Sequence, residues 1–166
     1  MQRVEKQIRA ACLCLTIGMG LLLYPLSGRQ AAWAASSRIE TMSMDELNRL
    51  MGGGQGMYLM FFTASWCGHC KTMLPTLNRL YQHFHQSGLH FVAISIDAGG
   101  PQAMQRVLSD HRVDFPVYWV GESAVDALRL IGIPMIFLIK KDHRVEKIPG
   151  TCSYTFLEAK IQDLIK

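Results

Sequence analysis

The sequence predicts an α/β domain in which helices cover both faces of a mixed β-sheet. Apolar runs that suit buried strands alternate with segments that begin at helix-capping residues. Such alternation builds largely parallel sheets. Near the C-terminus, two strand-like segments at 135–140 and 144–148 lie three residues apart, and so short a link favours an antiparallel hairpin. Parallel and antiparallel strands together make the sheet mixed.

The elements can be placed from capping residues, apolar runs and breaks. Ser43 to Glu46 has the S-x-x-E form of a capping box, which predicts a short helix that ends near Met51. A glycine-rich break at 52–56 separates this helix from an apolar run that suits a strand buried on both faces. From that run onward the expected order is β-α-β-α-β-α-β-β-α. Strands are expected at 57–62, 89–96 and 115–120, and the hairpin strands at 135–140 and 144–148. Helices are expected at 67–86, with a kink at Pro75 and an end at Ser87-Gly88, at 101–111 and at 123–130, and a second capping box at Thr155 to Glu158 opens the last helix.

Residues 1–34 have the pattern of a secretory signal peptide. A basic stretch from Met1 to Arg9 precedes an uncharged run at 10–26, and the small-residue sequence Ala32-Trp33-Ala34 follows. We expect cleavage after Ala34, with cleavage after Ala35 as the second choice. An uncleaved membrane anchor is the alternative, because the apolar run is near the lower limit for spanning a bilayer. In both cases the domain at 35–166 would be exported, with the periplasm as its expected compartment.

Charge and cysteine content narrow the function class. From Ala35 onward, 13 Lys and Arg side chains stand against 12 Asp and Glu. The domain is therefore close to neutral and lacks the basic patch that nucleic-acid binding requires. Export would leave Cys67, Cys70 and Cys152, an odd number that does not suit a disulfide scaffold. A reactive pair plus one further thiol is the better interpretation.

Cys67 and Cys70 form a C-x-x-C motif where the predicted strand 57–62 gives way to a helix. A cysteine at a helix N-terminus lies beside unpaired N–H groups and the positive end of the helix dipole, which stabilise the thiolate that attacks disulfides. Two intervening residues bring the second sulfur within bonding reach. We assign Cys67 as the exposed nucleophile and Cys70 as the more buried resolving thiol. His69 adds a partly positive imidazole that should make the pair more oxidising.

Two other interpretations of this motif are weaker. A structural zinc site needs a second ligand pair, whereas the sequence holds no second C-x-x-C, and His83 and His85 point to different sides of the predicted helix. A structural bridge across two residues would close too small a loop to stabilise the fold. We therefore expect no metal site, and no cofactor beyond the redox-active disulfide itself.

At this motif the sequence resembles the thioredoxin superfamily, over about residues 40–166. Residues 62–71, Phe-Thr-Ala-Ser-Trp-Cys-Gly-His-Cys-Lys, match its active-site signature, and Trp-Cys-Gly-His-Cys is the form seen in protein disulfide isomerases. Pro75 matches the family's helix-kinking proline, Gly132-Ile133-Pro134 the loop with its cis-proline, and Gly150 its C-terminal pattern. The resemblance implies a thioredoxin-like fold. It also implies that Ile133, Pro134 and Gly150 contact substrate, with a backbone edge left open for an extended segment.

Within the superfamily, the sequence looks like the TlpA/ResA-like exported branch, whose members are tethered or periplasmic reductants that often serve cytochrome c assembly. The branch also has an added helix and strand, here around 97–120. Two positions depart from it. Gly68-His69 points toward an oxidase or isomerase, and Phe61 stands where the superfamily commonly has a buried acid or, in this branch, Asn. The sequence leaves open whether Asp97, a water or nothing replaces that group. The segments that carry the match are 89–97, 115–117 and 133–139.

Residues around the pair are expected to tune it. Gly68 and His69 lie between the cysteines, Trp66 should form a partly exposed contact surface, and Lys71 could stabilise the thiolate. Core capping by Trp66 and simple solvation of Lys71 are the alternatives. For Cys152 we prefer a small buried hydrophobe over a thiol that forms alternative disulfides.

These observations predict an exported thiol–disulfide oxidoreductase that acts on protein substrates through Cys67 and Cys70. It would serve as a reductant or isomerase, with cytochrome c maturation implied by the resemblance. The expected partners are exported protein thiols and disulfides, a redox partner that regenerates the pair, and a membrane where the N-terminal segment is retained. An oxidase of exported thiols and a Cu(I)-binding module with soft thiolate ligands are the alternatives.

Overall fold

A computed structural model describes residues 38–52 and 56–166 of the chain. The signal peptide or anchor expected at 1–34 lies outside the described residues. The elements, in order, are β1 (Glu40–Thr41), α2 (Met44–Met51), β2 (Met57–Thr63), α3 (Gly68–Phe84), β3 (Leu89–Ser95), α4 (Pro101–His111), β4 (Val117–Trp119), α5 (Ser123–Leu128), β5 (Met135–Ile139), β6 (Val145–Pro149) and α6 (Tyr154–Leu164).

The six strands form one mixed sheet in the order β1-β4-β3-β2-β5-β6. Strands β1, β4, β3 and β2 run parallel, whereas β5 lies antiparallel to β2 and pairs with β6 as a hairpin. Strands β2, β3 and β5 are almost wholly buried, which explains why their sequences are continuous apolar runs. The predicted mixed α/β sheet is confirmed.

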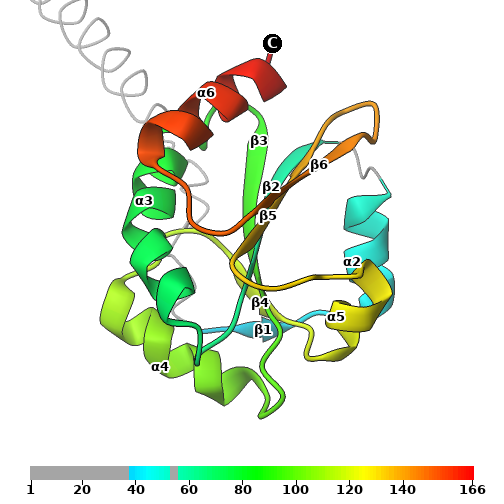
Figure 1. The fold of residues 1–166 in the computed structure, drawn as a ribbon, viewed down its shortest axis with the longest axis vertical. Coiled ribbons are helices and arrows are strands. Elements are labelled where there is room, and N and C mark those ends of the chain that lie inside the picture. The colour runs from blue at the N-terminus through cyan, green and yellow to red at the C-terminus, as the bar shows by residue number, and fades with distance from the viewer. Residues whose placement is uncertain (1–37, 53–55) are drawn as a thin grey trace, which may run out of the picture. The chain divides into compact units, whose positions relative to one another are not determined.

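Helices cover both faces of this sheet (Figure 1). Helix α3 packs beside α4 and α6, while α2 and α5 lie on the opposite face. Leu74, Leu77 and Leu80 give α3 a fully buried stripe at helical spacing. Each such side chain contributes about 1.5–3 kcal/mol when it is removed from water. This burial fixes α3 on the sheet, and with it the position of the helix N-terminus that carries the cysteines.

The strands at the β1 edge of the sheet differ from the prediction. Strand β1 was not expected, because Glu40 and Thr41 are exposed and carry no apolar pattern; it exists through its pairing with β4. Strand β4 is three residues long rather than the six expected at 115–120. It begins at Val117 because Pro116 has no N–H to donate to a ladder.

The two expected capping boxes had different outcomes. At α2, Ser43 and Glu46 bond each other's backbone N–H groups as predicted. The second box, at Thr155 to Glu158, is wrong. Ser153 caps α6 by accepting from the N–H of Phe156 at 3.2 Å, so the helix begins one residue before Thr155. Glu158 instead accepts a hydrogen bond from the hydroxyl of Tyr154, because the two residues lie one turn apart in the helix.

Candidate active site

A disulfide joins Cys67 and Cys70 at the start of α3, with 5.3 Å between the two Cα atoms. Strand β2 ends at Thr63, and the chain turns through Ala64 to Cys67, whose N–H donates to the Ala64 carbonyl at 3.1 Å. Cys67 is the N-cap of the helix, and its Sγ accepts from the N–H of Cys70 at 3.1 Å. The nucleophile position predicted from the motif is thus an N-cap sulfur with a backbone donor already aimed at it.

The electrostatic setting favours a thiolate at Cys67. The first turn of α3 contains no acidic side chain, so no carboxylate opposes the positive end of the helix dipole. One difference from the prediction concerns exposure. Cys67 is only 6% exposed and Cys70 is completely buried, so the order of accessibility is as expected, but Cys67 is less open than an exposed nucleophile.

The side chains beside the pair lie on the surface. Trp66 is 69% exposed, which fits a contact surface rather than a cap on the core. Gly68 and His69 are also exposed, and Lys71 is partly buried. A Cβ at Gly68 would meet no atom within 4 Å, so the backbone does not require glycine there. The His69 carbonyl accepts from the hydroxyl of Thr72 at 2.8 Å, which tightens the first turn of α3.

The loop before β5 reaches the same end of the sheet as the cysteines. Met135 pairs with Phe62 near the end of β2, and the Ile133–Pro134 peptide bond just before it is cis. The carbonyl of Pro134 accepts from the N–H of Gly150 at 2.9 Å. The structure therefore brings the three expected substrate-contact residues to the sheet end from which the active-site turn emerges. Ile131, in the same loop, is 89% exposed and was not singled out by the sequence.

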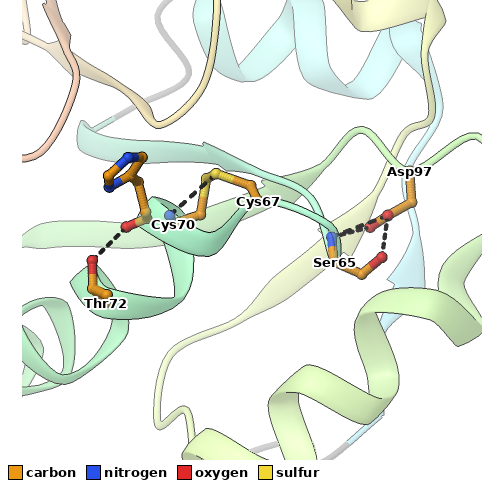
Figure 2. The surroundings of a disulfide bond; sticks show 6 residues. Ser65, Cys67, Cys70, Thr72 and Asp97 are labelled. Carbon is orange, nitrogen blue, oxygen red and sulfur yellow. Dashed lines mark hydrogen bonds between the residues drawn. A yellow bond between two sulfur atoms is a disulfide. The ribbon is translucent and has the colours of Figure 1, made fainter.

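A buried carboxylate, which the sequence offered as one possible replacement for the missing acid, lies under the active-site turn. Asp97 is 2% exposed and accepts from the N–H of Ser65 at 3.0 Å and from its hydroxyl at 2.6 Å. The hydroxyl of Ser95 donates to the same carboxylate at 2.8 Å. Figure 2 shows Asp97 directed at Ser65, with the cysteines on the other side of that residue. The hydrogen bonds that the Asp97 carboxylate accepts thus come from Ser65, in the active-site turn, and from Ser95.

Two further residues complete the comparison with the prediction. Phe61 is fully buried between β3 and β5, so an aromatic ring fills the position where an acid was expected in relatives. Cys152 is partly buried and packs against the core, and its thiol donates weakly to the Gly150 carbonyl at 3.8 Å. Burial raises the pKa of the Cys152 thiol, which keeps it in the unreactive protonated form.

Within residues 38–52 and 56–166, no three His, Cys, Asp or Glu side chains are grouped to hold a metal ion. In the same part of the chain, no helix has the length and apolar character needed to cross a bilayer.

Comparison with known proteins agrees with the fold and the cysteine motif described above. A sequence model of the thioredoxin-like family matches residues 55–145. The thiol-disulfide oxidoreductase ResA of Oceanobacillus iheyensis is 30% identical over 113 residues, which are 67% of this chain and 58% of that protein. The chain thus spans a little over half the length of this relative.

Two solved structures share the fold. One is a DsbE-type thiol:disulfide interchange protein from Chlorobium tepidum, with a TM-score of 0.63, 23% identity, and coverage of 72% of this chain and 85% of that one. The other is a secreted disulfide oxidoreductase of Mycobacterium tuberculosis, with a TM-score of 0.58, 18% identity, and coverage of 66% and 83%. The family match spans more than half of the sequence and includes the cysteine pair, and this chain belongs to the thioredoxin-like family.

Proposed function

We propose that the protein is an exported thiol–disulfide oxidoreductase that exchanges disulfides with other exported proteins. The observation that carries this proposal is the Cys67–Cys70 disulfide at the N-terminus of α3, where Cys67 is the more accessible sulfur and already accepts a backbone hydrogen bond. A bridge across two residues stabilises a fold little. A pair in this position is suited to being opened and closed.

The exchange follows from this geometry. In the reduced protein, the Cys67 thiolate attacks one sulfur of a substrate disulfide, and the other substrate sulfur leaves and takes up a proton. The Cys70 sulfur, after losing its proton, attacks Cys67 in the mixed disulfide. The second substrate thiol is released and the Cys67–Cys70 bond forms, so two electrons have passed to the substrate. A dithiol partner reverses these steps on the protein to regenerate it.

The surface around the pair supports recognition of an extended substrate segment. Pro134 and Gly150 lie at the same sheet end as the active-site turn, and Trp66 offers an exposed ring beside Cys67. Pairing between the backbone of an extended substrate and the backbone beside Pro134 would give affinity without requiring one substrate sequence. Reduction or isomerisation of exported proteins is the proposed role, and cytochrome c maturation is the setting that the resemblance to the ResA-like branch suggests.

Variants of the three cysteines test the function. We expect Cys67→Ser to abolish reduction of insulin disulfides and Cys70→Ser to accumulate mixed disulfides with substrate, because the resolving thiol is lost. Cys152→Ser is the matched control and should retain turnover. Turnover by the Cys67 variant at the rate of the unmodified protein would reject the assignment.

Two measurements address direction and location. The reduction potential of the Cys67–Cys70 couple separates a reductant, near about −270 mV, from an oxidase or isomerase, nearer about −120 to −180 mV. N-terminal sequencing of the protein purified from a periplasmic fraction should give Ala35 as its first residue. Recovery in the cytoplasm with Met1 intact would reject export.

A further inference from the structure

Asp97 is a buried carboxylate that the exchange chemistry does not use. The hydrogen bonds it accepts come from the backbone N–H and hydroxyl of Ser65 and from the hydroxyl of Ser95, all of them uncharged donors. Burying a carboxylate is costly unless its hydrogen bonds are satisfied, and an apolar side chain of similar volume is often as stable or more so. Packing alone therefore does not account for an acid at this position.

The geometry shows what the carboxylate controls. Ser65 lies two residues before Cys67, in the turn that the hydrogen bond from Cys67 N–H to the Ala64 carbonyl closes. Both carboxylate oxygens reach the Ser65 N–H at 3.0 Å, and Ser65 and Asp97 are 32 residues apart in the chain. The contact thus links the turn to the end of β3, in addition to the covalent chain that joins the turn to β2 and α3.

We propose that Asp97 is a positioning residue for the redox pair: by holding Ser65, it fixes the turn so that the Cys67 sulfur stays at the N-cap of α3. This inference rests on the proposed function, because it assigns Asp97 to the reactivity of the same pair. The link to reactivity is the 3.1 Å hydrogen bond from the Cys70 N–H to Cys67 Sγ, which a shift of the turn would lengthen. A weaker donor stabilises the thiolate less.

Asp97→Asn and Ser65→Ala test the proposal in the full chain. In Asp97→Asn one acceptor oxygen becomes an NH₂ group that faces donors, while Ser65→Ala removes the hydroxyl bond and leaves the backbone bond in place. After reduction, iodoacetamide labelling at a series of pH values, read by mass spectrometry of the peptide that contains Cys67, gives the pH midpoint and rate of thiolate reaction.

We expect both variants to move this midpoint upward, toward the value of about 8.5 for an ordinary thiol. Exchange with insulin should slow by about 10- to 100-fold in Asp97→Asn, because displacements of 1 Å have effects of that size, and less in Ser65→Ala. Asp142→Asn, which makes the same chemical change on a surface carboxylate that accepts from Arg144, is the control and should leave the labelling profile unchanged.

The outcomes separate positioning from general stability. Ser153→Ala removes the N-cap of α6 and lowers the melting temperature without touching the turn. If Asp97→Asn lowers only the melting temperature, as Ser153→Ala does, and leaves the Cys67 labelling profile in place, the proposal is overturned. If Asp97→Asn fails to fold, an unchanged Cys67 labelling profile in Ser65→Ala is by itself enough to overturn the proposal. Labelling needs no protein substrate, so a chain that exchanges no protein disulfides would reject the proposed function while this test could still be decided.

Discussion

The charge of His69 provides a quantitative test of how the site tunes the redox pair. A positive imidazole in the first turn of α3 stabilises the Cys67 thiolate, which exists in the reduced form alone, so it should make the couple more oxidising. His69→Gln removes the charge and keeps a polar side chain of similar size. The variant should therefore have a more negative reduction potential.

The exposure of His69 sets the size of this effect. The side chain lies in solvent, and interactions between solvent-exposed charges contribute about 0.2–1 kcal/mol. Because 30 mV corresponds to roughly 1.4 kcal/mol for a two-electron couple, the expected shift is about 4–20 mV. The shift should vanish in about 1 M salt, where the screening length falls to about 3 Å.

Equilibration against glutathione redox buffers, with the reduced and oxidised forms counted by mass spectrometry, measures the shift. His85→Gln is the control, because it makes the same change at the other, C-terminal end of α3. No shift at low salt would refute the electrostatic role. A shift that persists unchanged in 1 M salt would show that His69 acts through a direct contact instead.

Three further predictions concern the rest of the domain. Because burial raises the pKa of the Cys152 thiol, iodoacetamide at pH 8 should label Cys152 more slowly in the folded protein than in 8 M urea, and equal rates would contradict this. The N–H and hydroxyl of Ser43 lower the pKa of Glu46 below its ordinary 4.5. This contribution to stability is therefore present above that pH and is lost as the pH falls through the lowered value. As the pH falls below 4.5, urea midpoints should drop more in the unmodified protein than in Ser43→Ala. Trp119→Phe removes the indole N–H that donates to the Asp97 carbonyl at 2.7 Å, and urea unfolding should show a loss of about 0.5–1.5 kcal/mol.

The sequence was sufficient where the physics is local. Strands β2, β3 and β5 are buried on both faces and therefore appear as apolar runs, and the start of α2 follows from the reciprocal bonds of Ser43 and Glu46. The geometry of the cysteine pair is also set locally, because Cys67 and Cys70 are three positions apart at the start of one helix. For α6, Ser153 and Thr155 are both residue types that cap helices, and they lie two positions apart. The sequence pattern alone did not show which of the two is the N-cap.

Strand β1 and the contact between Ser65 and Asp97 depend on partners far away in the sequence and were not predicted. Strand β1 is a strand only because β4 lies beside it. The contact between Ser65 and Asp97 needs β2 and β3 to be parallel neighbours in register, with Thr63 opposite Ser95. One signal was present in the sequence: an apolar strand that ends in Ser95-Ile96-Asp97 places an acid at the same sheet end as the active-site turn. That signal becomes a contact only once the register is known.

The segment between β3 and α5 has a structural link to the active site. The chain leaves β3 after Ser95, passes through Asp97, forms α4, and returns as β4, which pairs with β3. On its return, Trp119 donates to the Asp97 carbonyl, and the N–H groups of Val120 and Gly121 donate to the Ser95 carbonyl at 3.0 and 3.2 Å. The backbone that carries the Ser65-binding carboxylate is therefore held by hydrogen bonds from Trp119, Val120 and Gly121. These hydrogen bonds also help to hold the turn before Cys67 in place, because the Asp97 carboxylate joins the end of β3 to Ser65 in that turn.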